Sequence, residues 1–175
     1  MKVAFIGLGV MGYPMAGHVK TAGMDVCVYN RTEKKAKQWC VDYGGSMAAT
    51  PAEAAKDCDV ILVCVGNDDD VRQVVISDDG VFAGMSESAI LVDHTTASAS
   101  LARELYEKAK SQGKQILDAP VSGGQAGAEN GALTVMIGGD QSTYEAAKPV
   151  IDVYSKFNKL LGPAGNGQLA KAANQ

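Results

Sequence analysis

The stretch KVAFIGLGVMG, residues 2–12, decides the fold of this chain. Its apolar run over residues 2–6 predicts a buried strand. The strand leads directly into the pattern G-x-G-x-x-G, whose first glycine permits a tight turn, whose second lets the backbone approach a pyrophosphate, and whose third lets the next helix pack closely on the strand. The N–H groups at the start of that helix can bind a diphosphate. We therefore predict a dinucleotide-binding turn formed by Gly7, Leu8, Gly9, Val10, Met11 and Gly12, with a purely structural turn as the alternative.

Short apolar segments alternate with helical ones along the rest of the chain. Runs rich in Val, Ile, Leu and Cys predict strands over residues 2–6, 25–29, 60–65, 89–93, 115–118 and 133–137. Helical spacing predicts helices over residues 11–22, 51–56 and 142–152, and a further one that starts at Ser98 and stops at Gly113. This alternation is typical of an α/β, Rossmann-type, doubly wound and mostly parallel sheet.

Composition excludes several classes of protein. With 175 residues, 46% hydrophobic and 21% charged, the chain has the make-up of an ordinary globular domain. The net charge of −4 comes without a basic stripe, which argues against a nucleic-acid partner. No apolar run is long enough to cross a bilayer, so no membrane partner is expected. The four cysteines form no C-x-x-C pair, so we expect no metal site and a reducing, cytoplasmic location.

The end of the second predicted strand bears on which dinucleotide is bound. NAD sites usually place Asp or Glu there, about twenty residues after the glycine turn, to hold the ribose hydroxyls. This chain has Asn30, Arg31 and Thr32 instead, with Lys35 one helical turn later. A neutral Asn does not repel a 2′-phosphate, and Arg can bind phosphate with two parallel hydrogen bonds. These residues favour NADP(H) over NAD, although NAD remains an option. The alternative to a phosphate-binding role is that Arg31 and Lys35 are solvated surface residues.

Four segments together resemble the β-hydroxyacid dehydrogenase family, which includes 3-hydroxyisobutyrate dehydrogenase, tartronate semialdehyde reductase and glyoxylate/succinic semialdehyde reductase. They run the length of the chain and read GLGVMGYPMA (residues 7–16), DHTT (93–96), DAPVSGGQAGA (118–128) and GNGQLAKAANQ (165–175). The resemblance implies hydride transfer between nicotinamide and a small β-hydroxy acid or semialdehyde. The Asn-Arg-Thr sequence with Lys35 is similar to the NADPH-preferring branch.

The resemblance also implies roles for individual residues. Lys171 matches the catalytic lysine that moves the hydroxyl proton of the substrate. Ser122, Gly123 and Gly124 match the loop that binds the substrate carboxylate, and their hydroxyl and bare N–H groups suit an anion. Asn174 matches a further substrate ligand. Thr96, Val65 and Gly66 match cofactor contacts, although the family often carries proline at the position of Gly66. His18 and His94 have no role supported by a motif, and we interpret His94 as a loop histidine.

The last part of the chain predicts a boundary. Residues 162–167 are rich in glycine, and the helix that follows has only begun when the sequence stops. We therefore expect a nucleotide-binding domain over residues 1–162 and, over residues 163–175, the start of an interdomain helix in a truncated product. The resemblance implies a second, all-helical domain that is absent from these residues, and a homo-oligomer for the longer protein.

Two rival interpretations stay open. A non-catalytic NAD(P)-binding module or redox sensor would keep the glycine turn, but it has no need for Lys171, Asn174 and Ser122 together. A methyltransferase that uses S-adenosylmethionine also has a glycine-rich first turn, but that class does not account for Arg31 or Lys171.

Overall fold

A computed structural model describes residues 1–174 of the chain. The strands are β1 (Lys2–Ile6), β2 (Asp25–Tyr29), β3 (Ser46–Met47), β4 (Val60–Val63), β5 (Ile90–Asp93), β6 (Gln115–Asp118), β7 (Val121–Ser122), β8 (Leu133–Gly138) and β9 (Ser155–Gly162). The helices are α1 (Gly12–Thr21), α2 (Glu33–Tyr43), α3 (Pro51–Ala55), α4 (Asp68–Val75), α5 (Val81–Gly84), α6 (Ala99–Ser111), α7 (Gly124–Glu129), α8 (Gln141–Ile151) and α9 (Asn166–Ala173).

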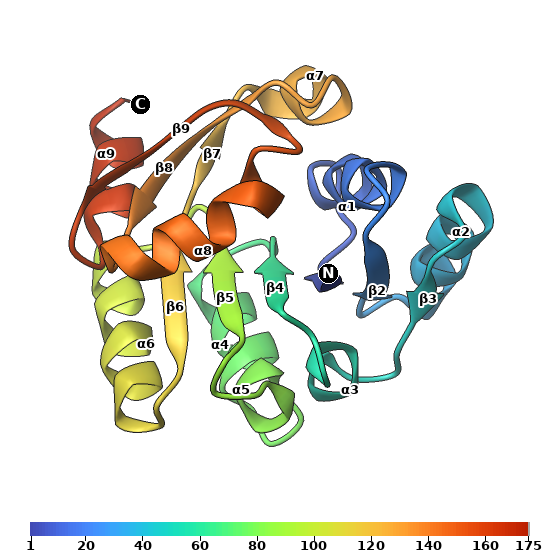
Figure 1. Cartoon of the computed structure of the whole chain (residues 1–175), viewed down its shortest axis with the longest axis horizontal. Coiled ribbons are helices and arrows are strands. Elements are labelled where there is room, and N and C mark those ends of the chain that lie inside the picture. Colours follow the sequence, from blue (N-terminus) through green and yellow to red (C-terminus); the bar gives the residue numbers. More distant parts are fainter. Residues whose placement is uncertain (175) are drawn as a thin grey trace.

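The strands of residues 1–174 form one sheet in the order β3-β2-β1-β4-β5-β6-β8-β7, with β9 on the other edge of β8. Neighbouring strands from β3 to β6 are parallel, whereas β8 runs antiparallel to β6 and β7. The strand order reverses at β1, which has β2 on one side and β4 on the other (Figure 1). Ligands of such sheets bind at the carboxyl ends of the strands beside this reversal. The predicted Rossmann-type, mostly parallel sheet is confirmed.

Helices cover both faces of the sheet because its strands are apolar on both sides. Val3 and Phe5 of β1 face a core that includes Met15 of α1, Trp39 of α2 and Val150 of α8. The alternate residues of β1 face a second core with residues of α3, α4, α5 and α6. Accordingly, α8 lies in front of the sheet in Figure 1, and α4 and α5 lie behind it.

Local sequence signals place the ends of α1 and α6 as predicted. Gly23 follows α1 with a φ of +97°, and Gly113 follows α6 with a φ of +70°, as expected of left-handed caps. The Ser98 hydroxyl accepts a hydrogen bond from the Leu101 N–H, which confirms the predicted N-cap. The strand predicted over residues 60–65 ends at Val63, and the last helix begins at Asn166 rather than at residue 168.

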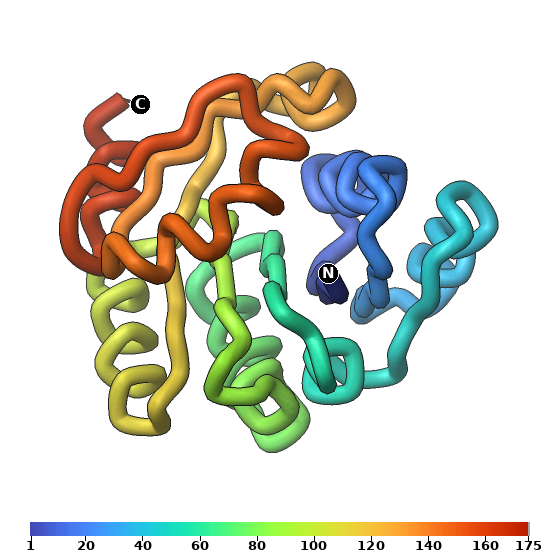
Figure 2. Tube along the Cα trace, viewed as in Figure 1, coloured from blue at the N-terminus to red at the C-terminus, as the bar shows by residue number. Residues whose placement is uncertain are grey.

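Several elements escaped the sequence pattern. Helix α2 is mostly exposed and is attached by the buried side chains of Ala36 and Trp39, so it lacks a broad apolar stripe. Strand β9 lacks a clear apolar pattern as well, because every residue along it is exposed or only partly buried. Figure 2 follows the chain from β1 in the middle of the sheet to α9, which packs against β8 and β9. Among residues 1–174, no helix combines the length and the apolar character needed to span a membrane.

Candidate functional site

The glycine turn between β1 and α1 has the geometry that the motif predicts. Gly7 has a φ of +102°, and a Cβ atom there would collide with the carbonyl oxygen of Cys64. A Cβ atom on Gly12 would collide with the carbonyl oxygen of Gly7, so this glycine permits close approach of α1 to the turn. A Cβ atom on Gly9 would meet no atom within 4 Å. Open space at this one position fits a bound pyrophosphate.

A first hollow of about 350 Å³ lies over this turn. Besides residues 7–12 it is lined by Asn30, Arg31, Thr32, Cys64, Val65, Gly66 and Asp70. The Asn30 side chain accepts a hydrogen bond from the Leu8 N–H at 2.9 Å and donates one to the Thr32 carbonyl at 3.0 Å. Asn30 therefore holds the end of β2 against the glycine turn, a role that the sequence did not predict.

Arg31 and Lys35 lie differently from each other. Arg31 is exposed at the rim of the first hollow, and no ion pair within residues 1–174 engages its guanidinium group. Lys35 does not line this hollow; it lines a neighbouring groove together with Gly9 and Val10. Of the two predicted cations, the structure brings only Arg31 into the hollow.

A second hollow of about 340 Å³ continues from the first, and the two share Met11, Cys64, Val65 and Gly66. It is also lined by His94, Thr95, Thr96, Val121, Ser122, Gly123, Gly124 and Lys171. The two hollows thus form one cleft along the carboxyl ends of the strands. This cleft runs from Arg31 in the first hollow to Thr96 and Lys171 in the second.

Lys171 and Ser122 meet in the second hollow. The Lys171 Nζ donates a hydrogen bond to the Ser122 Oγ at 3.1 Å. Gly123 and Gly124 follow with φ angles of +128° and +60°, values that side chains rarely adopt. Two successive bare backbone N–H groups and a hydroxyl thus lie beside an ammonium group, a set that can bind a carboxylate.

Asn174 is not part of this cluster. It is exposed and caps the end of α9, and its amide contacts the Met136 sulfur at 3.8 Å rather than the hollow. Asn174 was expected to lie beside Lys171 on one helix face. Because α9 ends at Ala173, the Asn174 side chain is not directed into the cleft with Lys171. Gln175, the last residue of the fourth motif, lies outside the described residues.

Asp118 fixes the start of α9. Its buried carboxylate accepts hydrogen bonds from the N–H groups of Gly165 at 2.9 Å and Gln168 at 3.1 Å. A carboxylate at this end of a helix satisfies free N–H groups and interacts favourably with the helix dipole. Asp118 lies in the third quoted motif, but this role depends on a contact with the fourth and was not predicted.

Comparison with known proteins identifies the family. Residues 2–162 match the model of the NAD-binding domain of 6-phosphogluconate dehydrogenase. This chain belongs to that family of NAD-binding domains.

Individual relatives agree with the predicted resemblance. The domain is 61% identical to an uncharacterized oxidoreductase from Shewanella frigidimarina over 174 residues, which are 99% of the chain and 60% of that relative. It is 42% identical to the probable 3-hydroxyisobutyrate dehydrogenase-like 1, mitochondrial, of Arabidopsis thaliana, covering 99% of the chain and 52% of that relative. It is also similar to the solved structure of Mycobacterium tuberculosis 3-hydroxyisobutyrate dehydrogenase with L-serine, with a TM-score of 0.92 and 34% identity over 99% of the chain and 58% of that structure. The domain thus spans about 60% or less of these proteins.

His94 of the NAD-binding domain follows β5 in a loop, as predicted, but its side chain is fully buried. Its Nδ1 lies 2.6 Å from the Ala119 carbonyl oxygen, and its Nε2 lies 2.6 Å from the Tyr154 hydroxyl. A carbonyl can only accept, so Nδ1 carries the proton and Nε2 accepts from Tyr154. Burial lowers the pKa of His94 to about 4, so the ring stays neutral. His94 is thus a structural link between β5, β6 and the end of α8.

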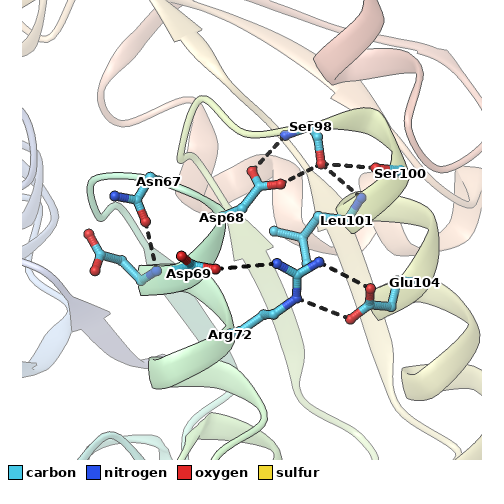
Figure 3. A network of polar contacts seen from close by, with 9 residues as sticks. Asn67, Asp68, Asp69, Arg72, Ser98, Ser100, Leu101 and Glu104 are labelled. Atoms are coloured by element: carbon cyan, nitrogen blue, oxygen red, sulfur yellow. Dashed lines mark hydrogen bonds and ion pairs between the residues drawn. The ribbon is translucent and has the colours of Figure 1, made fainter.

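A polar network ties two loops of the NAD-binding domain together beside the cleft (Figure 3). The Asp68 carboxylate accepts hydrogen bonds from the N–H of Ser98 at 2.9 Å and from its hydroxyl at 2.6 Å. These bonds lower the pKa of Asp68. An ion pair of 3.2 Å between Arg72 and Glu104 extends the contact between α4 and α6. The network holds the loop after β5 against the start of α4.

Proposed function

We propose that this NAD-binding domain is part of an oxidoreductase that transfers a hydride between NADP(H) and a small β-hydroxy acid or semialdehyde of the 3-hydroxyisobutyrate type. One observation carries the proposal: Lys171 and Ser122 lie in the same cleft as the glycine turn. A purely nucleotide-binding module would not need an amine and a hydroxyl at the far end of that cleft.

The preference for NADP(H) is supported by Arg31. Its guanidinium group is exposed at the adenosine end, and the neutral Asn30 stands where an acidic residue would repel a 2′-phosphate. Lys35 is left out of this assignment because it lines the neighbouring groove. Thr96, Val65 and Gly66 would contact the nicotinamide half.

The chemistry proposed for the chain's own residues is proton transfer and substrate binding. Bound NADP⁺ would supply the acceptor for the hydride that leaves the carbon carrying the hydroxyl group. Lys171 takes the proton of that hydroxyl as a neutral amine during oxidation, and it returns the proton as an ammonium group during reduction. Ser122, Gly123 and Gly124 bind the substrate carboxylate, which keeps the hydroxyl beside the Lys171 amine. Asn174, one turn after Lys171, is a further candidate substrate ligand, although its amide contacts the Met136 sulfur in this structure and would have to turn toward the cleft.

The proposal extends to the longer protein. Residues 1–162 would form the nucleotide-binding domain, and residues 163–175 would begin the helix that leads into a second, helical domain. That protein would be a homo-oligomer, as the resemblance implies, with a small molecule rather than a nucleic acid or a membrane as its partner. All four cysteines are unpaired thiols, which supports a reducing compartment such as the cytoplasm.

A two-step experiment tests the function. The 175-residue chain is titrated with NADPH and NADH while nicotinamide fluorescence is followed, and its melting temperature is measured with each. A chain extended to the length of its relatives is then supplied with NADP⁺ and a panel of small β-hydroxy acids, and the appearance of reduced nicotinamide is recorded. We expect binding in the first step and turnover in the second. Binding by both chains without any turnover would favour a non-catalytic module instead.

A further inference from the structure

The loop between β5 and α6 presents a single exposed side chain to the second hollow. Thr96 is exposed and lines that hollow, whereas Thr95 before it is buried and Ala97 after it is partly buried. A short exposed residue keeps one orientation only if the backbone on both sides of it is held. The contacts of that backbone therefore restrict where the Thr96 side chain can lie in the hollow.

Gln168 of α9 holds the backbone on both sides of Thr96. Its Nε2 donates a hydrogen bond to the Thr95 carbonyl at 2.7 Å, and its Oε1 accepts one from the Ala97 N–H at 3.0 Å. The Gln168 side chain is buried, with a residue exposure of 3%. A primary amide offers one donor and one acceptor side by side, so it can pair with both groups at once. Buried polar groups of this kind are costly unless both bonds are made.

Two other contacts restrain the same loop from different sides. The Thr95 hydroxyl accepts a hydrogen bond from the Val65 N–H at 3.0 Å, and Ser98 is bound by Asp68 (Figure 3). Both contacts come from the loop and helix that follow β4. Gln168 connects the same loop to α9 on the opposite side. The start of α9 is in turn fixed by Asp118.

Gln168 also lies three residues before Lys171 on the same helix, so the two side chains project from adjacent turns. Lys171 reaches Ser122 on one side of the cleft, and Gln168 reaches the backbone beside Thr96 on the other. A shift of α9 would therefore move the amine and the threonine loop together.

We propose that Gln168 is a positioning residue that presents Thr96 to the nicotinamide end of the dinucleotide and keeps that end in register with Lys171. This inference rests on the proposed function, since it needs a dinucleotide in the cleft. Gln168 itself does not line either hollow. Its effect is transmitted through Thr96.

Binding measurements on the 175-residue chain test the inference with two ligands. NADPH reaches both ends of the cleft, whereas adenosine 2′,5′-bisphosphate carries only the adenosine half. Gln168→Met keeps the side-chain length without either hydrogen bond, and Gln168→Glu keeps the acceptor but loses the donor. We expect both variants to weaken NADPH by about three- to tenfold, the scale of one lost hydrogen bond. Affinity for the bisphosphate should stay unchanged. Gln73→Met, on the exposed side of α4, is the matched control.

A double substitution shows whether the effect passes through Thr96. Thr96→Ala alone should weaken NADPH selectively, and adding Gln168→Met to it should cause little further loss. Unchanged NADPH affinity in the Gln168 variants, equal loss of both ligands, or fully additive losses would each overturn the inference. Thr96 is exposed, so Thr96→Ala should fold even if the Gln168 variants do not. An unchanged NADPH affinity in Thr96→Ala would by itself reject the proposed role of Gln168. Failure of the unaltered chain to bind NADPH would instead reject the proposed function.

Discussion

The side-chain nitrogen of Lys171 lies 3.1 Å from the hydroxyl oxygen of Ser122, although 49 residues separate them in the sequence. Strand β8 brings them together, because β7 pairs with one edge of it and α9 packs against it. The hydroxyl and the amine thus reach the cleft from two different elements. This convergence is what distinguishes the site from a simple nucleotide-binding turn.

In the longer protein, Lys171→Ala should lower kcat by about 10² to 10⁴, the usual contribution of a positioned acid or base. NADPH affinity should hardly change, because Lys171 contacts the Ser122 loop proposed to bind the substrate rather than the glycine turn proposed to bind the pyrophosphate. Ser122→Ala should mainly raise KM, as loss of a ground-state contact does. Steady-state kinetics measure both effects, with Lys110→Ala on the exposed side of α6 as the control. Undiminished turnover by Lys171→Ala would eliminate the lysine from the mechanism.

Arg31→Ala should weaken NADPH binding by roughly tenfold or more and leave NADH almost unchanged, because only NADPH carries the phosphate that a guanidinium group binds. Fluorescence titration of the 175-residue chain with each cofactor measures the difference. Lys34→Ala, an exposed cation on α2 outside the cleft, should leave both affinities intact. Equal losses for NADPH and NADH in Arg31→Ala would contradict the 2′-phosphate assignment.

Gly9→Val should abolish binding of either dinucleotide while leaving the sheet folded. The added side chain has open space in the protein itself, and that space is where the pyrophosphate would lie. Gly12→Val is the contrasting variant: its Cβ atom meets the Gly7 carbonyl, so the fold itself should lose stability. Calorimetry and circular dichroism separate the two outcomes. A folded Gly9→Val chain with normal NADPH affinity would mean that the turn is only structural.

The stability of the domain should fall in acid through His94. Burial holds the pKa of His94 near 4 in the folded state, below its ordinary value of 6.5, so the folded state binds fewer protons than the unfolded state between these values. The resulting stability is present above about pH 6.5 and is lost as the pH falls toward 4. The contribution is at most about 3 kcal/mol.

Denaturant unfolding of the natural chain and of His94→Gln at several pH values isolates this effect. The natural chain should lose more stability than the variant between neutral pH and pH 4. Comparison with the variant is needed because burial raises the pKa of the neighbouring Asp93 to about 7, which gives the opposite slope. Parallel pH profiles for the two chains would show that His94 is not the group responsible.

The sequence by itself determined the features that depend on neighbouring residues. The glycine turn, the apolar strands, the Ser98 cap and the Asn30-Arg31 pair lie within short segments, so their geometry follows from local chain preferences and from the spacing of apolar residues. The predicted sheet is confirmed, and the glycine turn has the predicted geometry, for this reason. Helix α2 and strand β9 were missed because each buries too little apolar surface to leave a clear period in the sequence.

Only the tertiary structure decided which distant residues meet. It brought Lys171 to Ser122 and Gln168 to the loop of Thr96, but it left Lys35 and Asn174 outside the cleft. It also showed that Asn30 holds the glycine turn and that His94 is a buried hydrogen-bonded link. The physical reason is that these contacts depend on the order of strands in the sheet, on the antiparallel direction of β8, and on where α9 ends. No local pattern encodes those distances, because each is set by the packing of elements that lie far apart in the chain.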